Sequence, residues 1–201
     1  MRLTALLVWA GLTLAVAASA QPRVANPGFE QDRFTVWPGY LRHNGGGIAG
    51  WQGGSGVNPI WNHPETQKGP EAPFCDNGKI PEGKQLAFIQ GPGRLSQRVS
   101  GFEAGRTYRV LFRENARVHR PAPEAAWPRV QVTLGGKVIV SPHEVRPVSR
   151  RDDFTAPFVR VESASFTAAA DGAYELVFET LHKESSTVLL DDVSVQEVTV
   201  P

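Results

Sequence analysis

The sequence predicts an all-β fold, an antiparallel β-sandwich, on three observations. β-branched and aliphatic residues form short runs of strand length. Glycine, proline or aspartate separates these runs, as turns require. No long amphipathic helix interrupts them, so the strand–helix alternation of an α/β fold is missing. Regular short strands joined by turns are typical of a sandwich.

The predicted strands follow one another along the second half of the chain. They cover residues 85–90, 94–99, 107–118, 129–134, 137–140, 158–167, 173–181 and 187–198. Gly135 and Gly136 form a two-residue hairpin signal between two of them. Residues 103–106, 171–172 and 183–186 carry turn-forming residues that fit other connections.

Residues 1–20 read as a signal peptide. Arg2 provides the positive start, residues 6–16 are apolar, and Ala18-Ser19-Ala20 matches a cleavage site. The apolar run is too short for a comfortable membrane span. The sequence therefore predicts a secreted or periplasmic protein of one domain, residues 21–201, with no membrane attachment after cleavage.

The composition narrows the possible partners. The formal net charge is +1, and there is no basic stripe of the kind that nucleic-acid binding requires. Cys75 is the only cysteine, so no intrachain disulfide can form. The domain must therefore be held by its core, with or without the help of a metal ion.

Residues 38–84 differ from the rest of the chain because they are rich in glycine and proline. A loop region of this length is usually functional or disordered. Its aromatic residues, with Trp51 among them, favour ordered loops that cover an edge or a face of the sandwich. A minor core packed beneath a long loop remains the alternative.

The last predicted strand carries an acid among apolar residues. Strict alternation places Asp191 on one face with Leu189, Val193 and Val195, and Asp192 on the opposite face. A buried carboxylate must take up a proton or meet a cation or hydrogen-bond donors. Asp191 is therefore predicted to be buried, with a partner that the strand itself does not reveal.

Six short motifs carry a resemblance to a known family. They are, in order, Asn26-Pro27-Gly28-Phe29-Glu30, Gly50-Trp51, the run from Gly83 to Gln90, Leu95-Ser96-Gln97, Gly105-Arg106-Thr107-Tyr108 and Leu190-Asp191-Asp192-Val193. In this order they resemble galactose-binding-domain-like jelly rolls, particularly carbohydrate-binding modules of the family 4/9/22 type and related exported bacterial domains. The resemblance spans nearly all of residues 21–201 and implies a jelly-roll sandwich.

The resemblance also implies a structural calcium ion that ties the first strand to the last. The family pattern carries over to Glu30 and Asp191 as ligands, with main-chain carbonyls completing the set. Calcium takes roughly 6–8 oxygen ligands of these kinds. The alternative is that Asp191 accepts backbone N–H bonds at a turn or in the strand ladder.

Sugar binding needs aromatic rings for stacking and convergent polar groups for the hydroxyls. The predicted aromatic positions are Trp37, Tyr40, Trp61 and Trp127. Arg113, Asn115 and Arg117 share one face of the predicted strand 107–118, which is either a solvated face or a binding face. Two arginines there would also suit the carboxylate of an acidic sugar.

Asp76 and Asn77 are further polar candidates, within the stretch Phe74-Cys75-Asp76-Asn77-Gly78. This stretch is also a strong turn signal, so a purely structural role is equally open.

The sequence thus predicts an exported, non-catalytic module that binds glycan and carries structural calcium. No metal-ligand spacing, nucleophile elbow or phosphate loop is present. A structural or adhesive module of an envelope or extracellular matrix is the first alternative. The second is a small glycan hydrolase, for which Glu114 and Glu179 would be the carboxylate pair.

Overall fold

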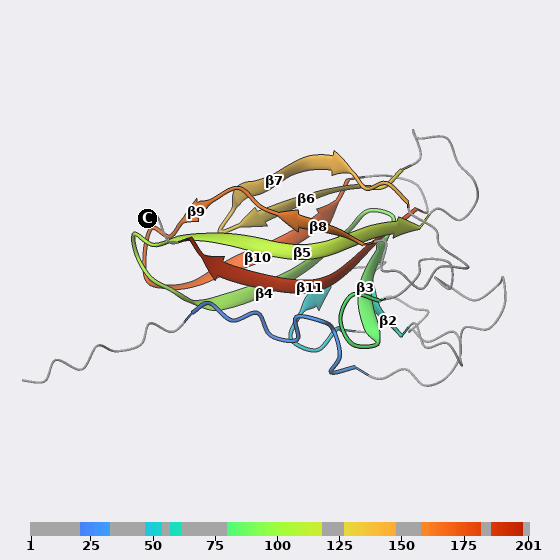
Figure 1. Ribbon diagram of the computed structural model, residues 1–201, viewed down its shortest axis with the longest axis horizontal. Helices are drawn as coiled ribbons and strands as arrows, with labels where there is room; N and C mark the ends of the chain where they lie inside the picture. The colour runs from blue at the N-terminus through green and yellow to red at the C-terminus, as the bar shows by residue number, and fades with distance from the viewer. Residues whose placement is uncertain are drawn as a thin grey trace, which may run out of the picture.

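The computed structural model describes residues 21–32, 47–53, 57–61, 80–117, 127–147, 158–181 and 186–198. For residues 57–61 only the main chain is described. Within these ranges the chain folds as two antiparallel sheets that pack face to face, which confirms the predicted sandwich (Figure 1). The part of the chain that the structure describes holds no helix long and apolar enough to cross a membrane.

The first sheet has five strands. Their spatial order is β1 (Gln52–Gly53), β4 (Gly93–Phe102), β10 (Gly172–Thr180), β6 (Arg129–Leu134) and β7 (Lys137–Glu144). Its central strand, β10, pairs with β4 along its whole length and with β6 from Leu176 to Thr180.

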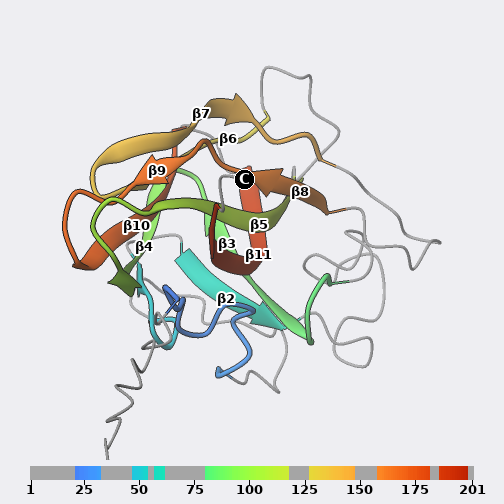
Figure 2. The same ribbon diagram turned by 60° about the vertical axis from the view of Figure 1, so that its left-hand side comes forward.

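The second sheet has six strands and carries the candidate site. Five of them follow the order β2 (Val57–Trp61), β3 (Gln85–Gln90), β11 (Thr187–Glu197), β5 (Thr107–Arg117) and β8 (Val159–Glu162). The sixth, β9 (Phe166–Thr167), pairs with the other end of β5. Figure 2 shows β5 and β11 side by side at the centre of this sheet.

The predicted strands match the observed ones closely, with two differences. Residues 158–167 form two strands, because the main chain turns away from β5 at Ser163 and Ala164. The N–H of Ser163 still bonds Val110 of β5, but the N–H of Ala164 bonds Ile139 of β7 in the other sheet. The edge strands β1 and β2 were not predicted, since they lie in the glycine- and proline-rich region. Pro59 is tolerated in β2 because that strand lies at an edge.

The main core fills the space between the two sheets with aliphatic and aromatic side chains. Phe112 and Phe178 meet edge to face across it, with ring centroids 5.0 Å apart. Trp51 is buried and lies 6.1 Å from Phe178, which confirms a structural position for this tryptophan.

A second, smaller core lies on the outer side of the second sheet. It consists of Ile80, Leu86, Phe88, Phe158 and Leu189. β3 and the first half of β11 are therefore buried on both faces, as their continuous apolar sequences indicate. The sequence offered a minor core beneath residues 38–84 as the alternative to loops that cover an edge or a face of the sandwich.

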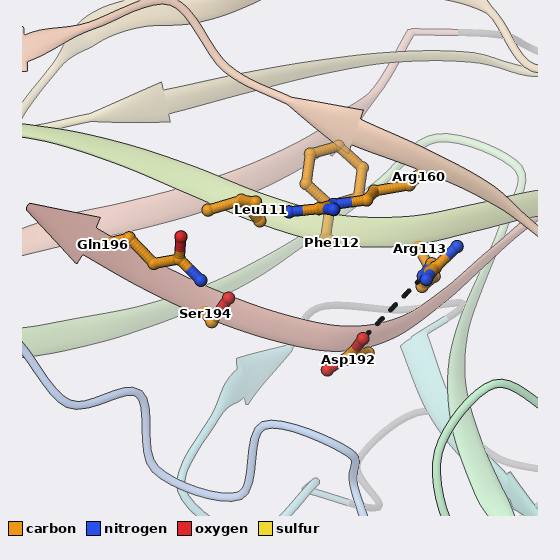
Figure 3. A pocket seen from close by; sticks show the side chains of 7 residues that line it. All are labelled: Leu111, Phe112, Arg113, Arg160, Asp192, Ser194 and Gln196. Carbon is orange, nitrogen blue, oxygen red and sulfur yellow. Dashed lines mark ion pairs between the residues drawn. The ribbon is translucent and has the colours of Figure 1, made fainter. Parts of the chain in front are cut away.

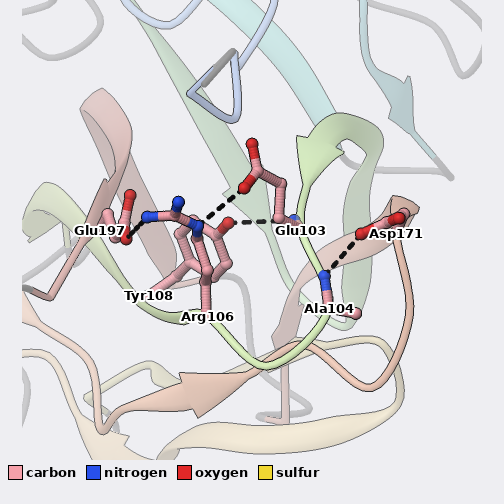
Figure 4. Close-up of polar contacts among 6 residues, drawn as sticks. All are labelled: Glu103, Ala104, Arg106, Tyr108, Asp171 and Glu197. Carbon is pink, nitrogen blue, oxygen red and sulfur yellow. Dashed lines mark hydrogen bonds and ion pairs between the residues drawn. The ribbon is translucent and has the colours of Figure 1, made fainter. Parts of the chain in front are cut away.

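The turn between β4 and β5 joins both sheets at one end of the sandwich (Figure 4). The hydroxyl of Tyr108 accepts the N–H of Glu103 at 3.0 Å. The N–H of Ala104 donates to Asp171, which precedes β10. Arg106 forms ion pairs with Glu103 and with Glu197 at the end of β11. These contacts fix the end of the sandwich that is remote from the smaller core.

Candidate functional site

The last strand contains a β-bulge at Asp191 and Asp192. Asp191 pairs with Arg113 of β5, and pairing resumes with Ser194 opposite Leu111, so one extra residue is accommodated. Asp192 has a φ of 51°, in the left-handed region that aspartate tolerates better than most residues.

The bulge changes which side chains share a face. Leu189 packs in the smaller core, whereas Val193 and Val195 pack in the main core. The predicted common face of Asp191 with Val193 and Val195 is therefore wrong, because strict alternation does not continue through a bulge. The predicted burial of Asp191 is confirmed, since its exposed fraction is 0%.

Two backbone N–H groups meet the carboxylate of Asp191. Oδ2 accepts the N–H of Glu82 at 2.9 Å, and Oδ1 accepts the N–H of Asp192 at 2.8 Å. Burial, together with the negative charges of Glu82 and Asp192, raises the pKa of Asp191 to about 8, although both N–H donors lower it. The carboxylate thus shapes the bulge and holds the segment that leads into β3.

Residues 26–30, near the N-terminus, bind the other end of the same segment, residues 82–85. Oε1 of Glu30 accepts the N–H groups of Lys84 at 2.7 Å and Gln85 at 2.6 Å. The carbonyl of Pro27 accepts the N–H of Val193 at 3.0 Å. Residues 26–30, 82–85 and 191–193 therefore form one hydrogen-bonded unit, which we term the terminal clip.

Close approach within the terminal clip requires glycine. A Cβ atom at Gly83 would lie 2.3 Å from the carboxyl carbon of Glu30. Gly83 also has a φ of 55°, which other residues rarely adopt. Asn26 and Phe29 have positive φ as well, and for a bulky phenylalanine such a conformation is strained.

Acidic groups crowd the terminal clip. Burial, and then the charges of Glu30 and Asp192, raise the pKa of Glu82 above its ordinary value. No three His, Cys, Asp or Glu side chains in the described ranges form a group that could hold a metal ion by themselves. A cation here would need main-chain carbonyls beside Glu30 and Asp191, as the family resemblance implies.

A hollow of about 250 Å³ lies next to the bulge, on the outer face of the second sheet (Figure 3). It is lined by Leu111, Phe112 and Arg113 of β5, Arg160 of β8, and Asp192, Ser194 and Gln196 of β11. We term it the β5–β11 hollow. The bulge places Asp192 at its edge, and the residues that follow supply a hydroxyl and an amide.

A polar pair, Glu114 and His143, joins the two sheets at the edge of the main core. Nε2 of His143 on β7 lies 2.8 Å from Oε1 of Glu114 on β5, and Nδ1 lies 3.2 Å from the carbonyl oxygen of Ser141. Both ring nitrogens thus face acceptors, which suits an imidazolium that donates twice. The hydrogen bond to Glu114 is the main cause that raises the pKa of His143, against the opposing effect of burial.

Glu114 and Glu179 do not form a carboxylate pair. Glu114 points into the sandwich, whereas Glu179 lies between core-facing Phe178 and Thr180 and so faces outward. There Glu179 accepts a hydrogen bond from Gln131. The two carboxylates therefore lie on opposite sides of the first sheet, without a shared cleft.

The structure brings together only part of the predicted ligand set. Arg113 lines the hollow, while Asn115 has an exposed fraction of 1% and Arg117 lies beyond the lining residues. Trp127 lies in the loop just before β6 of the other sheet, where the guanidinium of Arg146 stands 5.9 Å from its ring centroid. Trp37, Tyr40, Asp76 and Asn77 fall outside the described residues, as does the side chain of Trp61.

Four polar residues of the hollow were not predicted as ligand contacts from the sequence, and Asp192 in the bulge is one of them. Ser194 and Gln196 follow the bulge, and Arg160 comes from a strand with only four residues. Strict alternation does place Ser194 on the same face as Asp192. The position of Arg160 could not be predicted in this way, because no local pattern shows that β8 pairs with β5.

No protein family and no curated protein matches the chain by sequence. Solved structures do match over most of its length. A CBM61 module solved with β-1,4-galactotriose has a TM-score of 0.54 and 14% identity, over 86% of this chain and 96% of that one. The CBM22-1 xylan-binding domain of Xyn10C from Paenibacillus barcinonensis has a TM-score of 0.53 and 13% identity, over 92% and 100%.

An enzyme shares the same architecture. A cyclase from Fischerella sp. TAU, solved with 4-(1H-indol-3-yl)butan-2-one, matches with a TM-score of 0.55 and 14% identity, over 90% of this chain and 99% of that one. The chain therefore has the β-sandwich fold of carbohydrate-binding modules, which confirms the predicted resemblance. At these identities the likeness establishes the fold, and the fold alone does not decide the function.

The terminal clip predicts unequal effects for its two neighbouring aspartates. Asp191→Asn should lower the free energy of unfolding by about 1–3 kcal/mol, because an amide nitrogen then faces a buried N–H donor. Asp192→Asn makes the same substitution at an exposed, left-handed position that asparagine tolerates, so its effect should stay within about 0.5 kcal/mol. Urea unfolding measures both, and equal losses would contradict the assigned role of Asp191.

The Glu114–His143 pair predicts a pH dependence of stability. A histidine whose pKa is raised by folding stabilises the protein fully below its unfolded pKa of about 6.5, and this contribution disappears as the pH rises through the folded pKa. His143→Gln should therefore lower the free energy of unfolding more at pH 6 than at pH 9. Arg94→Gln is the control: it removes a charge from a surface ion pair with Glu175, and its effect should be the same at both pH values. A loss that is equal at both pH values, or larger at pH 9, would refute the pairing.

Proposed function

We propose that this protein is a non-catalytic module that binds glycan in the β5–β11 hollow. The observation that carries the proposal is the set of side chains in the hollow. Arg113, Ser194 and Gln196 offer donors and acceptors, beside a small apolar area from the largely buried Leu111. Sugars combine hydroxyl groups with apolar C–H faces, so they match such a mixed surface.

The architecture supports this proposal without deciding it. Two of the similar structures are binding domains, one solved with a galactotriose and one described as xylan-binding. The hollow is smaller than the roughly 300–1,000 Å³ of typical small-molecule sites, so it suits one sugar residue of a chain that continues along the sheet.

Aromatic stacking is the second part of the proposal. Trp37, Tyr40 and Trp61 remain proposed stacking positions, and Asp76 and Asn77 remain proposed polar contacts, all from the region predicted to cover the sandwich. Trp127 would contact sugar only outside the hollow, since it is not among the lining residues and precedes β6 of the other sheet.

We propose further that calcium occupies the terminal clip. Three observations support it: the crowding of Glu30, Glu82 and Asp191, the strained backbone at Phe29, and the shared segment 82–85. Calcium there would be held by Glu30 and Asp191 with main-chain carbonyls, and it would neutralise excess negative charge. Export is also part of the proposal, with removal of residues 1–20 before the module acts.

Glycan binding can be tested with the domain of residues 21–201 on an array of neutral and acidic oligosaccharides, in the presence of calcium. We expect binding to at least one glycan class. Gln196→Ala should weaken that binding by roughly tenfold, because it removes a hydrogen-bonding amide from the hollow. Arg98→Ala, on the outer face of the other sheet, should leave binding unchanged. Uniform absence of binding would overturn the proposed function.

Calcium can be tested by thermal unfolding with and without a chelator. At calcium concentrations about 100 times the Kd, a bound ion raises the melting temperature of a domain of this size by roughly 5–10 °C. The chelator should remove this increment from the unmodified protein and leave Glu30→Gln unaffected. An unmodified protein whose melting temperature does not depend on calcium would rule the ion out.

A further inference from the structure

Two arginines face each other across neighbouring strands in the β5–β11 hollow. Arg113 of β5 and Arg160 of β8 are direct partners in the antiparallel register, and both line the hollow (Figure 3). Directly opposed like charges destabilise a sheet unless an anion lies between or beside them. A negative group placed beside the two arginines would therefore be stabilised by both.

The acids of this face compensate only part of the positive charge. Glu162, the next acid along β8, is engaged by Arg109 of β5, which also bonds Ser165. Asp192 lies 3.8 Å from Arg113, measured from Oδ2 to Nε, which is too long for a hydrogen bond. Arg160 is exposed and has no ion-pair partner in the described part of the chain.

The remaining charge is distributed unevenly over the hollow. Asp192 lies on β11 and Arg160 on β8, with Arg113 on the strand between them. Glu82 lies near Asp192, since the charge of Asp192 helps to raise the pKa of Glu82. An anion would be repelled on that side and attracted on the side of Arg160. The negative group of a ligand should therefore sit beside β8, with the rest of the ligand directed toward β11.

We propose that the hollow recognises an acidic sugar, with the carboxylate of a uronate held by Arg160 and Arg113. This inference rests on the proposed glycan-binding function and names its ligand class. The planar fork of a guanidinium matches a carboxylate with two parallel hydrogen bonds. Ser194 and Gln196 on β11 then lie on the side of the hollow where ring hydroxyls would point.

A paired glycan array tests the ligand class. Oligosaccharides of homogalacturonan, alginate and glucuronoxylan are each printed beside a carboxyl-reduced counterpart of the same length, together with a sulfated galactan oligosaccharide. We expect binding to at least one uronate-bearing glycan and weaker binding, by about tenfold or more, to its reduced counterpart.

Variants of the hollow then assign the binding to the two arginines. By isothermal titration, Arg160→Gln should weaken binding of that uronate glycan by about tenfold or more. Arg160→Lys should also weaken it, because the charge remains but the fork is lost. Arg98→Gln removes the same charge from the exposed face of β4 and should bind as the unmodified protein does. Arg160 is exposed, and Arg160→Gln relieves the opposed charges, so its thermal unfolding should occur at the same temperature as that of the unmodified protein or slightly above it.

The possible outcomes separate this inference from the function on which it rests. Equal binding of acidic and reduced glycans, or full binding by Arg160→Gln, would overturn uronate recognition and leave glycan binding intact. Tighter binding of the sulfated oligosaccharide than of any uronate would also overturn it, in favour of a sulfate. Binding of no glycan at all, neutral or acidic, would overturn both.

Discussion

The hydrogen bonds of the buried Asp191 carboxylate are the interaction on which the rest of the structure depends. One oxygen holds the segment before β3 through Glu82, and the other holds the β11 bulge through Asp192. The N-terminal residues attach to the same two places through Glu30 and Pro27. A chain without an intrachain disulfide thus joins its first and last segments through backbone donors and two carboxylates.

The same bulge creates the candidate site. It reverses the alternation of β11, so the main core receives Val193 while Asp192 and Ser194 reach the outer face. The terminal clip and the proposed binding site therefore depend on one irregularity in one strand. The negative charge of the terminal clip also borders the hollow, which orients any anionic ligand toward Arg160 and away from the bulge. A calcium ion in the terminal clip would weaken that repulsion.

The sequence predicted what depends on local pattern. Alternation and turn residues were sufficient for most strands, for the sandwich, and for the burial of Asp191. The bulge was not predictable, because the alternation argument assumes its absence, and so the face of Val193 was assigned wrongly. Arg160 and His143 depend on pairing between distant segments, which no local pattern records. Glu114 was predicted only as one of a possible carboxylate pair, and its actual partner, His143, comes from the other sheet.

Native-state hydrogen exchange tests the central role of the terminal clip most directly. The amides to follow are those of Glu82, Lys84, Gln85, Asp192 and Val193, each of which donates within the clip. If the clip holds the fold together, these amides exchange only with global unfolding, at the same free energy as the core amides of β10. If they exchange through a local opening while β10 stays protected, the terminal clip is peripheral and does not hold the fold together.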